Sequence, residues 1–209
     1  MLKKILFSLV ALIAVAVVVI ATRPSAYAVE RSSQIAAPAD LVFGLVNDLH
    51  RWPAWSPWDK LDPQQTRTFD GAEAGTGAIF SWKGNDKVGE GRMTITESRP
   101  NELVAISLEF LKPWEAKNDV TISLAPAGEG TKVVWRMDGH NDFLGKAFTM
   151  FMDMDSMVGK DFEAGLASLG DLAKIEVEKR AAEEKARQEA EAAAQAAAAQ
   201  ASEDAVANE

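Results

Sequence analysis

Few residues of this 209-residue chain are of a type that carries out catalysis. The chain has no cysteine, which excludes thiolate nucleophiles, disulfides and zinc-thiolate sites. It has only two histidines, His50 and His140, too few for a histidine-built metal centre. We therefore predict no metal site, no cofactor and no set of catalytic residues.

Three groups of polar residues could be either functional sites or ordinary surface positions. Asp153 and Asp155 stand two positions apart, and on a helix such residues point in different directions, which favours a solvated face over a metal pair or an acid/base dyad. Glu109 lies beside Ser107 on the polar face of an expected strand, which favours the surface. His140 is of the right type for an acid/base group, because imidazole titrates near neutrality, but no nucleophile or second carboxylate accompanies it.

The charge and the glycine pattern disfavour nucleic acids and nucleotides. The formal net charge is −9, whereas binding of a phosphate backbone depends on clustered Lys and Arg. Gly71, Gly75 and Gly77 are spaced like a phosphate-binding loop, but a strand pattern follows them where a dinucleotide-binding loop needs a helix. We predict no nucleic-acid partner.

Three of the six tryptophans, Trp52, Trp55 and Trp58, fall within seven residues, with Pro53 and Pro57 between them. A spacing of three places their rings on a common side of a turn. Tryptophan buries a large apolar area and still carries an N–H that needs a partner. The cluster is therefore interpreted either as a plug of the core, which is favoured, or as the portal of a ligand cavity or a membrane contact.

Residues 1–23 have the composition of a membrane segment. Ile5 to Ala21 is apolar or small apart from one serine, and two lysines precede it. Its length is short for a membrane span and long for a signal sequence, and Ala26-Tyr27-Ala28 offers small residues where a signal peptidase cuts. The length and the strand pattern that follows favour an uncleaved anchor over a cleaved signal, which would release the protein into the periplasm. The lysines would keep the N-terminus cytoplasmic and the domain on the periplasmic or extracytoplasmic side.

Residues 24–175 have the size of one domain, and their pattern predicts an α+β fold. Tyr27 to Ala37 has the pattern of a strand, and Pro38-Ala39-Asp40 has that of a helix start. Apolar residues then alternate with polar ones, with turn residues between the runs, which predicts about six antiparallel strands with one wet face. A long helix capped by Asn141 or Asp142 is expected to cover the other face.

The expected C-terminal helix contains Gly145, Gly159, Gly165 and Gly170, each of which costs about 1 kcal/mol relative to alanine. They are interpreted as tolerated at close contacts or as leaving room between helix and sheet. Residues 176–209 are almost entirely Ala, Glu, Lys, Arg and Gln, which predicts a solvated helix that frays. This tail is interpreted as a solubilising extension, with a docking element as the alternative.

Several motifs resemble the START-like (SRPBCC) superfamily, especially its polyketide cyclase/dehydrase branch. They are Pro38-Ala39-Asp40-Leu41-Val42-Phe43, Trp52-Pro53-Ala54-Trp55-Ser56-Pro57-Trp58, Gly75-Thr76-Gly77, Gly89-Glu90-Gly91-Arg92-Met93, Glu97-Ser98-Arg99-Pro100-Asn101 and Gly130-Thr131-Lys132-Val133-Val134-Trp135. The resemblance covers residues 28–175 and implies a helix-grip fold, in which a curved antiparallel sheet wraps around a long C-terminal helix. In relatives the enclosed apolar cavity holds lipids, sterols, quinones or polyketides. The resemblance transfers no catalytic role to any residue.

From these patterns we predict a membrane-tethered domain that binds a hydrophobic small molecule or lipid without catalysis. An enzyme of the polyketide cyclase/dehydrase type and an interaction module that uses the acidic tail are the alternatives. An enzyme would need a polar pair that points into the cavity, and the sequence patterns indicate none. An ordinary filled core fits the same residues as well as a cavity does. The predicted cavity wall consists of Trp55, Trp58, Phe80, Trp82, Ile106, Phe110, Trp135, Met137, Phe151, Met154 and Val158.

Overall fold

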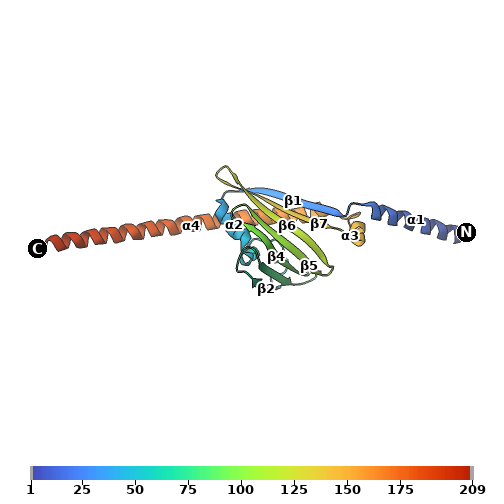
Figure 1. Cartoon of the computed structure of the whole chain (residues 1–209), viewed down its shortest axis with the longest axis horizontal. Coiled ribbons are helices and arrows are strands. Elements are labelled where there is room, and N and C mark those ends of the chain that lie inside the picture. Colours follow the sequence, from blue (N-terminus) through green and yellow to red (C-terminus); the bar gives the residue numbers. More distant parts are fainter. Residues whose placement is uncertain (1, 208–209) are drawn as a thin grey trace.

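The computed structural model describes residues 2–207, with side chains for residues 3–199. In chain order its elements are α1 (Leu2–Thr22), β1 (Ala26–Ile35), α2 (Ala39–Asn47), the 3-10 helices η1 (Leu49–Ala54) and η2 (Trp58–Lys60), β2 (Thr66–Gly71), β3 (Ala78–Lys83), β4 (Glu90–Arg99), β5 (Leu103–Lys112), β6 (Ala116–Ala127), β7 (Gly130–His140), α3 (Phe143–Phe148) and α4 (Met154–Ala207). A curved sheet lies at the centre, and α1 and the outer part of α4 leave it in opposite directions (Figure 1).

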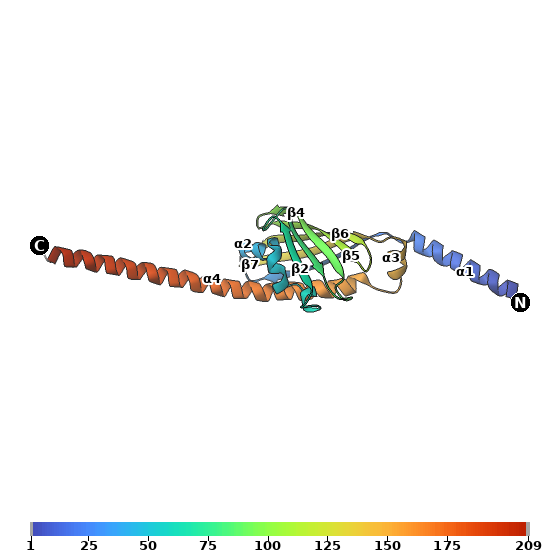
Figure 2. The same ribbon diagram turned by 90° about the horizontal axis from the view of Figure 1, so that it is seen from below.

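The seven strands form one antiparallel sheet in the order β1-β7-β6-β5-β4-β3-β2. Strands β2 to β7 are neighbours in chain order, and β1 pairs with β7, with Val29 opposite Met137. The first half of α4 runs along one face of this sheet, and α2 packs beside it at the far end (Figure 2). The predicted helix-grip architecture, with six strands after the first helix, is confirmed.

The burial of side chains follows the alternation seen in the sequence. In β7 the apolar residues Val133, Trp135 and Met137 are buried, whereas Lys132 and Arg136, which alternate with them, are exposed. Because successive side chains of a strand point to opposite faces, one face of the sheet is apolar and faces α4, and the other is polar and wet. We call the apolar face the inner face.

The prediction of one long helix from Asn141 onward is wrong, because the chain forms two helices with a break at residues 149–153. Asp142 begins the first helix, α3, by accepting a hydrogen bond from the backbone N–H of Gly145 at 2.7 Å. Asp153 begins the second in the same way. Its carboxylate accepts from the backbone N–H groups of Asp155 and Ser156 at 3.1 and 3.3 Å, and a capping carboxylate of this kind favours a new helix start.

The break divides the apolar stripe that was predicted for a single helix. Beyond it, Phe162 and Leu166 are at most 2% exposed and pack on the inner face. Before it, Leu144, Phe148 and Phe151 are 72%, 51% and 88% exposed. The early part of the stripe therefore does not cover the sheet.

Two glycines of α4 are sites of close contact with the sheet. A Cβ atom at Gly165 would lie 2.7 Å from a ring carbon of Trp135, and one at Gly159 would lie 2.0 Å from the guanidinium of Arg31. At Gly170 the nearest atom, on Ile35, would be 3.9 Å away, which is an ordinary contact. The interpretation of the glycines as close contacts is right for the first two positions.

These contacts predict opposite effects for the same substitution at two positions of one helix. Gly170→Ala should raise the free energy of unfolding by about 0.5 to 1 kcal/mol, because alanine is the better helix former and has room. Gly165→Ala should lower it, because the buried Trp135 ring cannot move aside. Urea unfolding of both variants would measure the difference, and equal shifts of the two midpoints would contradict the contact.

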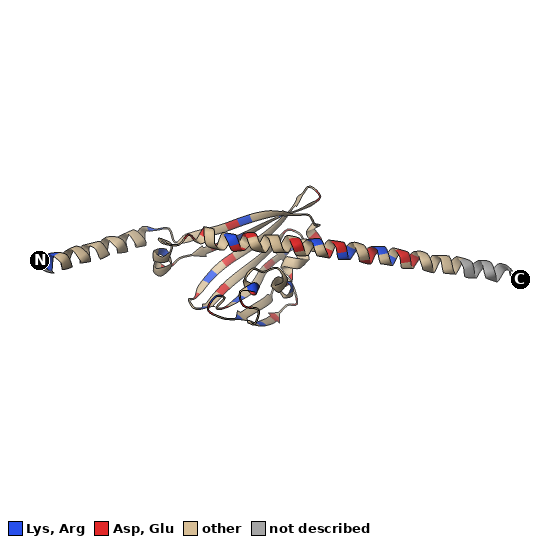
Figure 3. Ribbon diagram, turned by 180° about the vertical axis from the view of Figure 1, so that it is seen from behind, with Lys and Arg blue, Asp and Glu red and all other residues tan. Residues whose placement is uncertain are grey.

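The tail continues α4 as a helix to Ala207, as predicted. Every side chain described from residue 181 to 199 is exposed. Acidic and basic residues are interspersed along this outer part of the helix (Figure 3). Since this outer part covers no part of the sheet, only the first half of α4 packs on the inner face.

Candidate functional site

The centre of the inner face is an aromatic cluster around Trp135. The ring centroids of Trp52, Trp55 and Trp58 lie 6.0, 5.4 and 5.9 Å from that of Trp135, all at steep angles. Phe162 of α4 stacks on the same ring at 4.3 Å and 9°. The rings of the three tryptophans therefore lie on one side of their turns, as the spacing predicts. Through them η1 and η2 pack against Trp135 of the sheet and Phe162 of α4.

Trp52 and Trp55 are core residues. They are 2% and 0% exposed, and their Nε1 atoms donate hydrogen bonds to the carbonyl oxygens of Val46 at 2.9 Å and Leu45 at 3.3 Å. The core-plug interpretation is therefore right for these two side chains. Trp58 is only partly buried, and its ring packs edge-on against Phe162 of α4.

A second row of aromatic rings runs across the inner face from β2 to β5. The ring centroids of Phe69 and Phe80 lie 5.1 Å apart, those of Phe80 and Trp82 6.0 Å, and those of Trp82 and Phe110 5.9 Å. Gly91 of β4 makes this possible, because a Cβ atom there would lie 2.3 Å from the Trp82 ring. Trp82 and Phe110 are partly exposed, so the row ends at an open edge.

The inner face is sealed in its middle and partly open at the end from which α1 departs. One cross-strand row consists of Val29, Met137, Val120, Ile106 and Ile95, none of them more than 5% exposed. The next row toward α1 consists of Tyr27, Gly139, Asn118, Leu108 and Met93. In this row Tyr27, Leu108 and Met93 are only partly buried. Burial therefore decreases toward the α1 end.

A pocket of about 470 Å³ lies at this open end, between β1 and the chain that leads into α4. We call it the β1 pocket. Its wall consists of Pro24, Ala26, Tyr27, Ala28, Val29, Asn141, Thr149, Met150, Phe151, Met152, Asp153, Met154 and Asp155. The volume is within the range of about 300 to 1,000 Å³ that small-molecule sites have.

A polar pair lies on the inner face beside the β1 pocket. The Tyr27 hydroxyl donates a hydrogen bond to Oδ1 of Asn118 at 2.7 Å, and Asn118 is 4% exposed. Gly139 lies between them, and a Cβ atom there would approach both side chains within 2.5 Å. Burial raises the pKa of the Tyr27 phenol, so the hydroxyl stays protonated at neutral pH and remains a hydrogen-bond donor.

This pair was not predicted, although part of its signal is in the sequence. Tyr27 has the same phase as Val29 in the first strand, and Asn118 has the same phase as Val120 in β6. The alternation therefore places both polar side chains on the inner face, but it does not show that the two strands flank β7. The expectation of no polar pair on the inner face is wrong.

Arg31 fastens the start of α4 to β1 beside the pocket. Its guanidinium donates to Asp155 at 3.0 Å and to Glu163 at 2.7 Å. The hydrogen bond from Arg31 holds the pKa of the Asp155 carboxyl below its usual value. The ion pair thus contributes stability above the ordinary pKa of an aspartate, and the contribution is lost as the pH falls through the lowered one. Asp155 and the capping Asp153 are structural, as the solvated-face interpretation implies.

The other polar residues considered as candidate sites, His140 and Glu109, lie on the surface. His140 is exposed at the end of β7. Glu109 pairs with Arg92 and, at 3.5 Å, with Lys117 on the wet face of the sheet, and the Arg92 hydrogen bond lowers the pKa of its carboxyl. Among the described residues, no three His, Cys, Asp or Glu side chains are grouped so that they could hold a metal ion.

The structure divides the predicted cavity wall into three groups. Trp55, Phe80, Ile106, Trp135 and Met137 are buried in the core. The partly exposed residues at the edge of that core are Trp58, Trp82, Phe110 and Val158. Met154 and Phe151 line the β1 pocket, where Phe151 is almost fully exposed instead of lying on the inner face.

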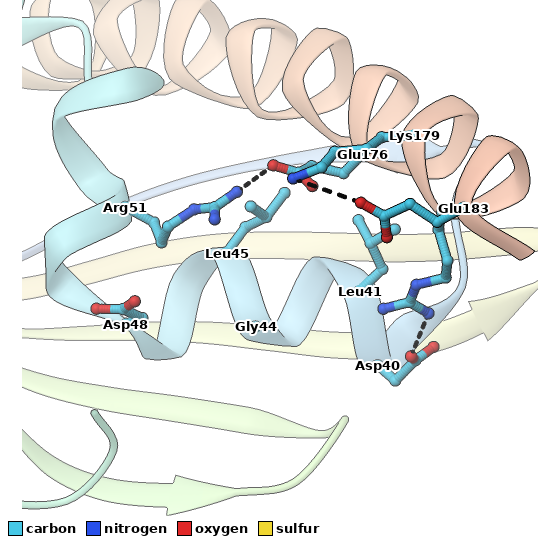
Figure 4. Close-up of a pocket in the computed structure, with 10 residues that line it drawn as sticks. Asp40, Leu41, Gly44, Leu45, Asp48, Arg51, Glu176, Lys179 and Glu183 are labelled. Carbon is cyan, nitrogen blue, oxygen red and sulfur yellow. Dashed lines mark hydrogen bonds and ion pairs between the residues drawn. The ribbon is translucent and has the colours of Figure 1, made fainter. Parts of the chain in front are cut away.

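A second, smaller pocket of about 260 Å³ lies between α2 and α4 (Figure 4). Ion pairs cross it from helix to helix, between Arg180 and Asp40 at 2.7 Å and between Arg51 and Glu176. The Arg180 hydrogen bond lowers the pKa of the Asp40 carboxyl. Because its charged groups already pair with one another, this cleft joins the two helices and offers little apolar surface to a ligand.

Solved structures share the fold at low sequence identity. A protein from Chromobacterium violaceum is 15% identical with a TM-score of 0.52, over 70% of this chain and 96% of that one. A protein from Rhizobium leguminosarum is 13% identical with a TM-score of 0.54, over 73% and 97%. The di-domain ARO/CYC StfQ from the steffimycin biosynthetic pathway is 10% identical with a TM-score of 0.53, over 73% and 52%.

No curated protein matches the sequence. The family model for polyketide cyclase/dehydrase and lipid transport proteins matches residues 27–174, which is the whole of the sheet and the packed half of α4. The chain therefore belongs to the polyketide cyclase/dehydrase and lipid transport family, within the START-like (SRPBCC) superfamily.

Proposed function

We propose that this protein binds a hydrophobic small molecule or lipid between the sheet and α4. The ligand would enter through the β1 pocket, and α1 would tether the protein to a membrane. The observation that carries the proposal is the decrease in burial along the inner face. The row that contains Ile106 is closed, and the row that contains Tyr27 is partly open beside a pocket of about 470 Å³. An apolar molecule placed there would extend the core.

The pocket wall suits an apolar ligand of no fixed shape. Three methionines, Met150, Met152 and Met154, line it, and their flexible thioether side chains adapt to different apolar surfaces. Each Å² of apolar ligand surface removed from water contributes about 25 cal/mol. The Tyr27 hydroxyl and the Asn118 amide beside the wall supply the few polar contacts that orient a ligand in such a site.

The length and composition of α1 support the tether. Residues Lys3–Thr22 have a mean hydropathy of 3.0, and no side chain of the stretch is buried in the protein. A helix of about 20 residues that are predominantly apolar is long enough to cross a bilayer. A cut after Ala28 would remove the first three residues of β1, which pair with β7, and with them Tyr27. This pairing favours an uncleaved anchor. The lysines before the span favour a cytoplasmic N-terminus, which would put the domain on the periplasmic side of a bacterial inner membrane.

Met154 in the wall of the β1 pocket gives a direct test of ligand binding. Met154→Ala should weaken the binding of a fluorescent fatty acid to the full chain about five- to tenfold, since about 1 to 1.4 kcal/mol of apolar contact is lost. Leu61→Ala, at a 47% exposed position outside both pockets, is the control and should bind as the wild type does. Unchanged affinity of a folded Met154→Ala protein would contradict binding in the β1 pocket.

An enzyme of the cyclase/dehydrase type is the second candidate, and the Tyr27–Asn118 pair is the observation that favours it. A protonated phenol can donate a hydrogen bond to a carbonyl oxygen on which negative charge develops. If the pair acts on the ligand, wild type and Tyr27→Phe should co-purify with molecules of different mass. If it only holds the ligand, the mass should be the same and the occupancy lower.

A further inference from the structure

From the distribution of exposed apolar side chains we infer that the α1 end of the domain docks on the surface of the bilayer that α1 crosses, so that the β1 pocket opens toward the lipid. The inference rests on the proposed membrane tether and extends it. In this arrangement the α1 end of the domain faces the membrane, and a ligand enters the β1 pocket from the bilayer.

Exposed apolar side chains are concentrated at one end of the molecule. Outside α1, ten large hydrophobic side chains among the described residues are exposed, and seven of them lie in residues 111–114 and 143–151. They include Trp114 at 79%, Leu144 at 72% and Phe151 at 88% exposure. Large apolar side chains that are exposed together at one end of a domain are typical of an interaction site.

The two segments belong to the same end of the sheet, where β1 begins. Phe110 pairs with Ala116 across the β5–β6 turn, and Gly139 near the end of β7 pairs with both Asn118 and Tyr27. Both views place this turn and α3 at the end of the sheet from which α1 departs (Figures 1 and 2). We call the exposed apolar residues of segments 111–114 and 143–151 the docking surface.

The linker keeps the docking surface close to the end of α1. Only three residues separate Thr22 from Ala26, and a chain of that length spans at most about 14 Å when fully extended. The contacts are closer still, because Nζ of Lys146 in α3 donates to the carbonyl oxygen of Ala21 at 3.3 Å. That carbonyl belongs to the last turn of α1, where the helix has no internal partner for it. If α1 crosses a bilayer, α3 must lie at the bilayer surface.

The side chains of the docking surface are of the types found at membrane interfaces, and they favour apolar burial over electrostatic attraction to anionic lipids. Aromatic rings, here Trp114, Phe148 and Phe151, gain by apolar burial, and tryptophan in particular is enriched at the level of lipid headgroups. The charged residues next to or within the two segments are of both signs, namely Lys112, Glu115, Asp142 and Lys146. We therefore expect docking to depend on apolar burial and to occur on zwitterionic phosphatidylcholine without anionic lipid.

The β1 pocket shares part of its wall with the docking surface. Met150 and Phe151 belong to both, and Pro24 of the pocket wall lies in the short linker to α1. A pocket that opens at the docked face would let an apolar molecule pass from the bilayer to the inner face without crossing water. The ligand class that follows is a molecule dissolved in the bilayer.

The absence of cysteine from the chain allows labels to be placed one at a time. Phe151→Cys and Trp114→Cys proteins, carrying an environment-sensitive fluorophore, would be reconstituted as full chains into phosphatidylcholine vesicles. Val15→Cys in α1 reports on the tether, and Ile175→Cys, 60% exposed on α4 away from the docking surface, is the aqueous control. Lipids that carry a nitroxide near the headgroup would quench any label in contact with the bilayer.

The expected result is at least about twofold quenching, with a blue-shifted emission, at positions 15, 114 and 151, and neither at position 175. Quenching at position 15 alone would overturn the docking surface and leave the tether intact. No quenching at position 15 would overturn both. Shielding at 114 and 151 that rises with protein concentration and is insensitive to the nitroxide would indicate a second copy of the chain and would also overturn the proposal.

Discussion

Replacing Trp135 by alanine should lower the free energy of unfolding by about 3 to 5 kcal/mol, which is the usual range for removing a large aromatic side chain from a core. Trp135 is 2% exposed and is the one ring that the Trp52, Trp55 and Trp58 rings and Phe162 all contact. Its removal would leave a cavity between η1, η2, the sheet and α4. Urea unfolding followed by circular dichroism would measure the change.

Two matched variants distinguish this role from a general effect of losing tryptophan. Trp135→Phe keeps most of the stacking and removes an indole N–H that has no hydrogen-bond partner among the described residues. Such an unpaired group costs about 1 to 3 kcal/mol, so we expect this variant to change the stability far less than alanine does. Trp114→Ala, at a 79% exposed position, should shift it by less than about 0.5 kcal/mol. A loss below about 1 kcal/mol for Trp135→Ala would contradict the central role of the cluster.

The second large effect concerns α1. We expect the protein to be retained in the membrane fraction after an alkaline carbonate wash and to keep its N-terminal segment. Leu9→Arg combined with Val15→Arg should abolish this retention, because each arginine near the centre of a membrane helix costs about 2.5 to 3.5 kcal/mol. The same positions changed to alanine are the control and should leave the protein in the membrane.

Intact-mass measurement of the extracted wild type completes this test. A mass that corresponds to the chain with its residues 1–28 would agree with an anchor. Loss of those residues would identify a cleaved signal sequence. It would also require β1 to lose its pairing of Ala26 with His140 and the Tyr27 hydrogen bond to Asn118.

Much of the fold was predictable because the alternation of apolar and polar residues has a simple physical cause. Apolar residues at every second position, as in Val133, Trp135 and Met137, require a strand with one buried face. The turn residues between the runs make neighbours in the chain neighbours in the sheet. The resemblance of the Trp52–Trp58 segment and of the glycine motifs to one superfamily then selected the helix-grip arrangement among antiparallel sheets.

The features that could not be predicted from the sequence depend on single hydrogen bonds or on contacts between residues far apart in the chain. The break between α3 and α4 is marked by one carboxylate, Asp153, and the apolar stripe on either side of it is compatible with a continuous helix. Phe151 was therefore expected on the inner face and is exposed instead. The pair of Tyr27 and Asn118 joins residues 91 positions apart, which alternation alone does not bring into contact.

The most direct test of hydrophobic ligand binding is native mass spectrometry of the full chain, purified from its membrane in detergent-free nanodiscs and then stripped of bulk lipid. We expect one apolar molecule of defined mass for each chain, retained by the wild type and depleted in Met154→Ala. A wild-type chain without such a molecule, which also fails to take up added fatty acids or phospholipids, would contradict the account.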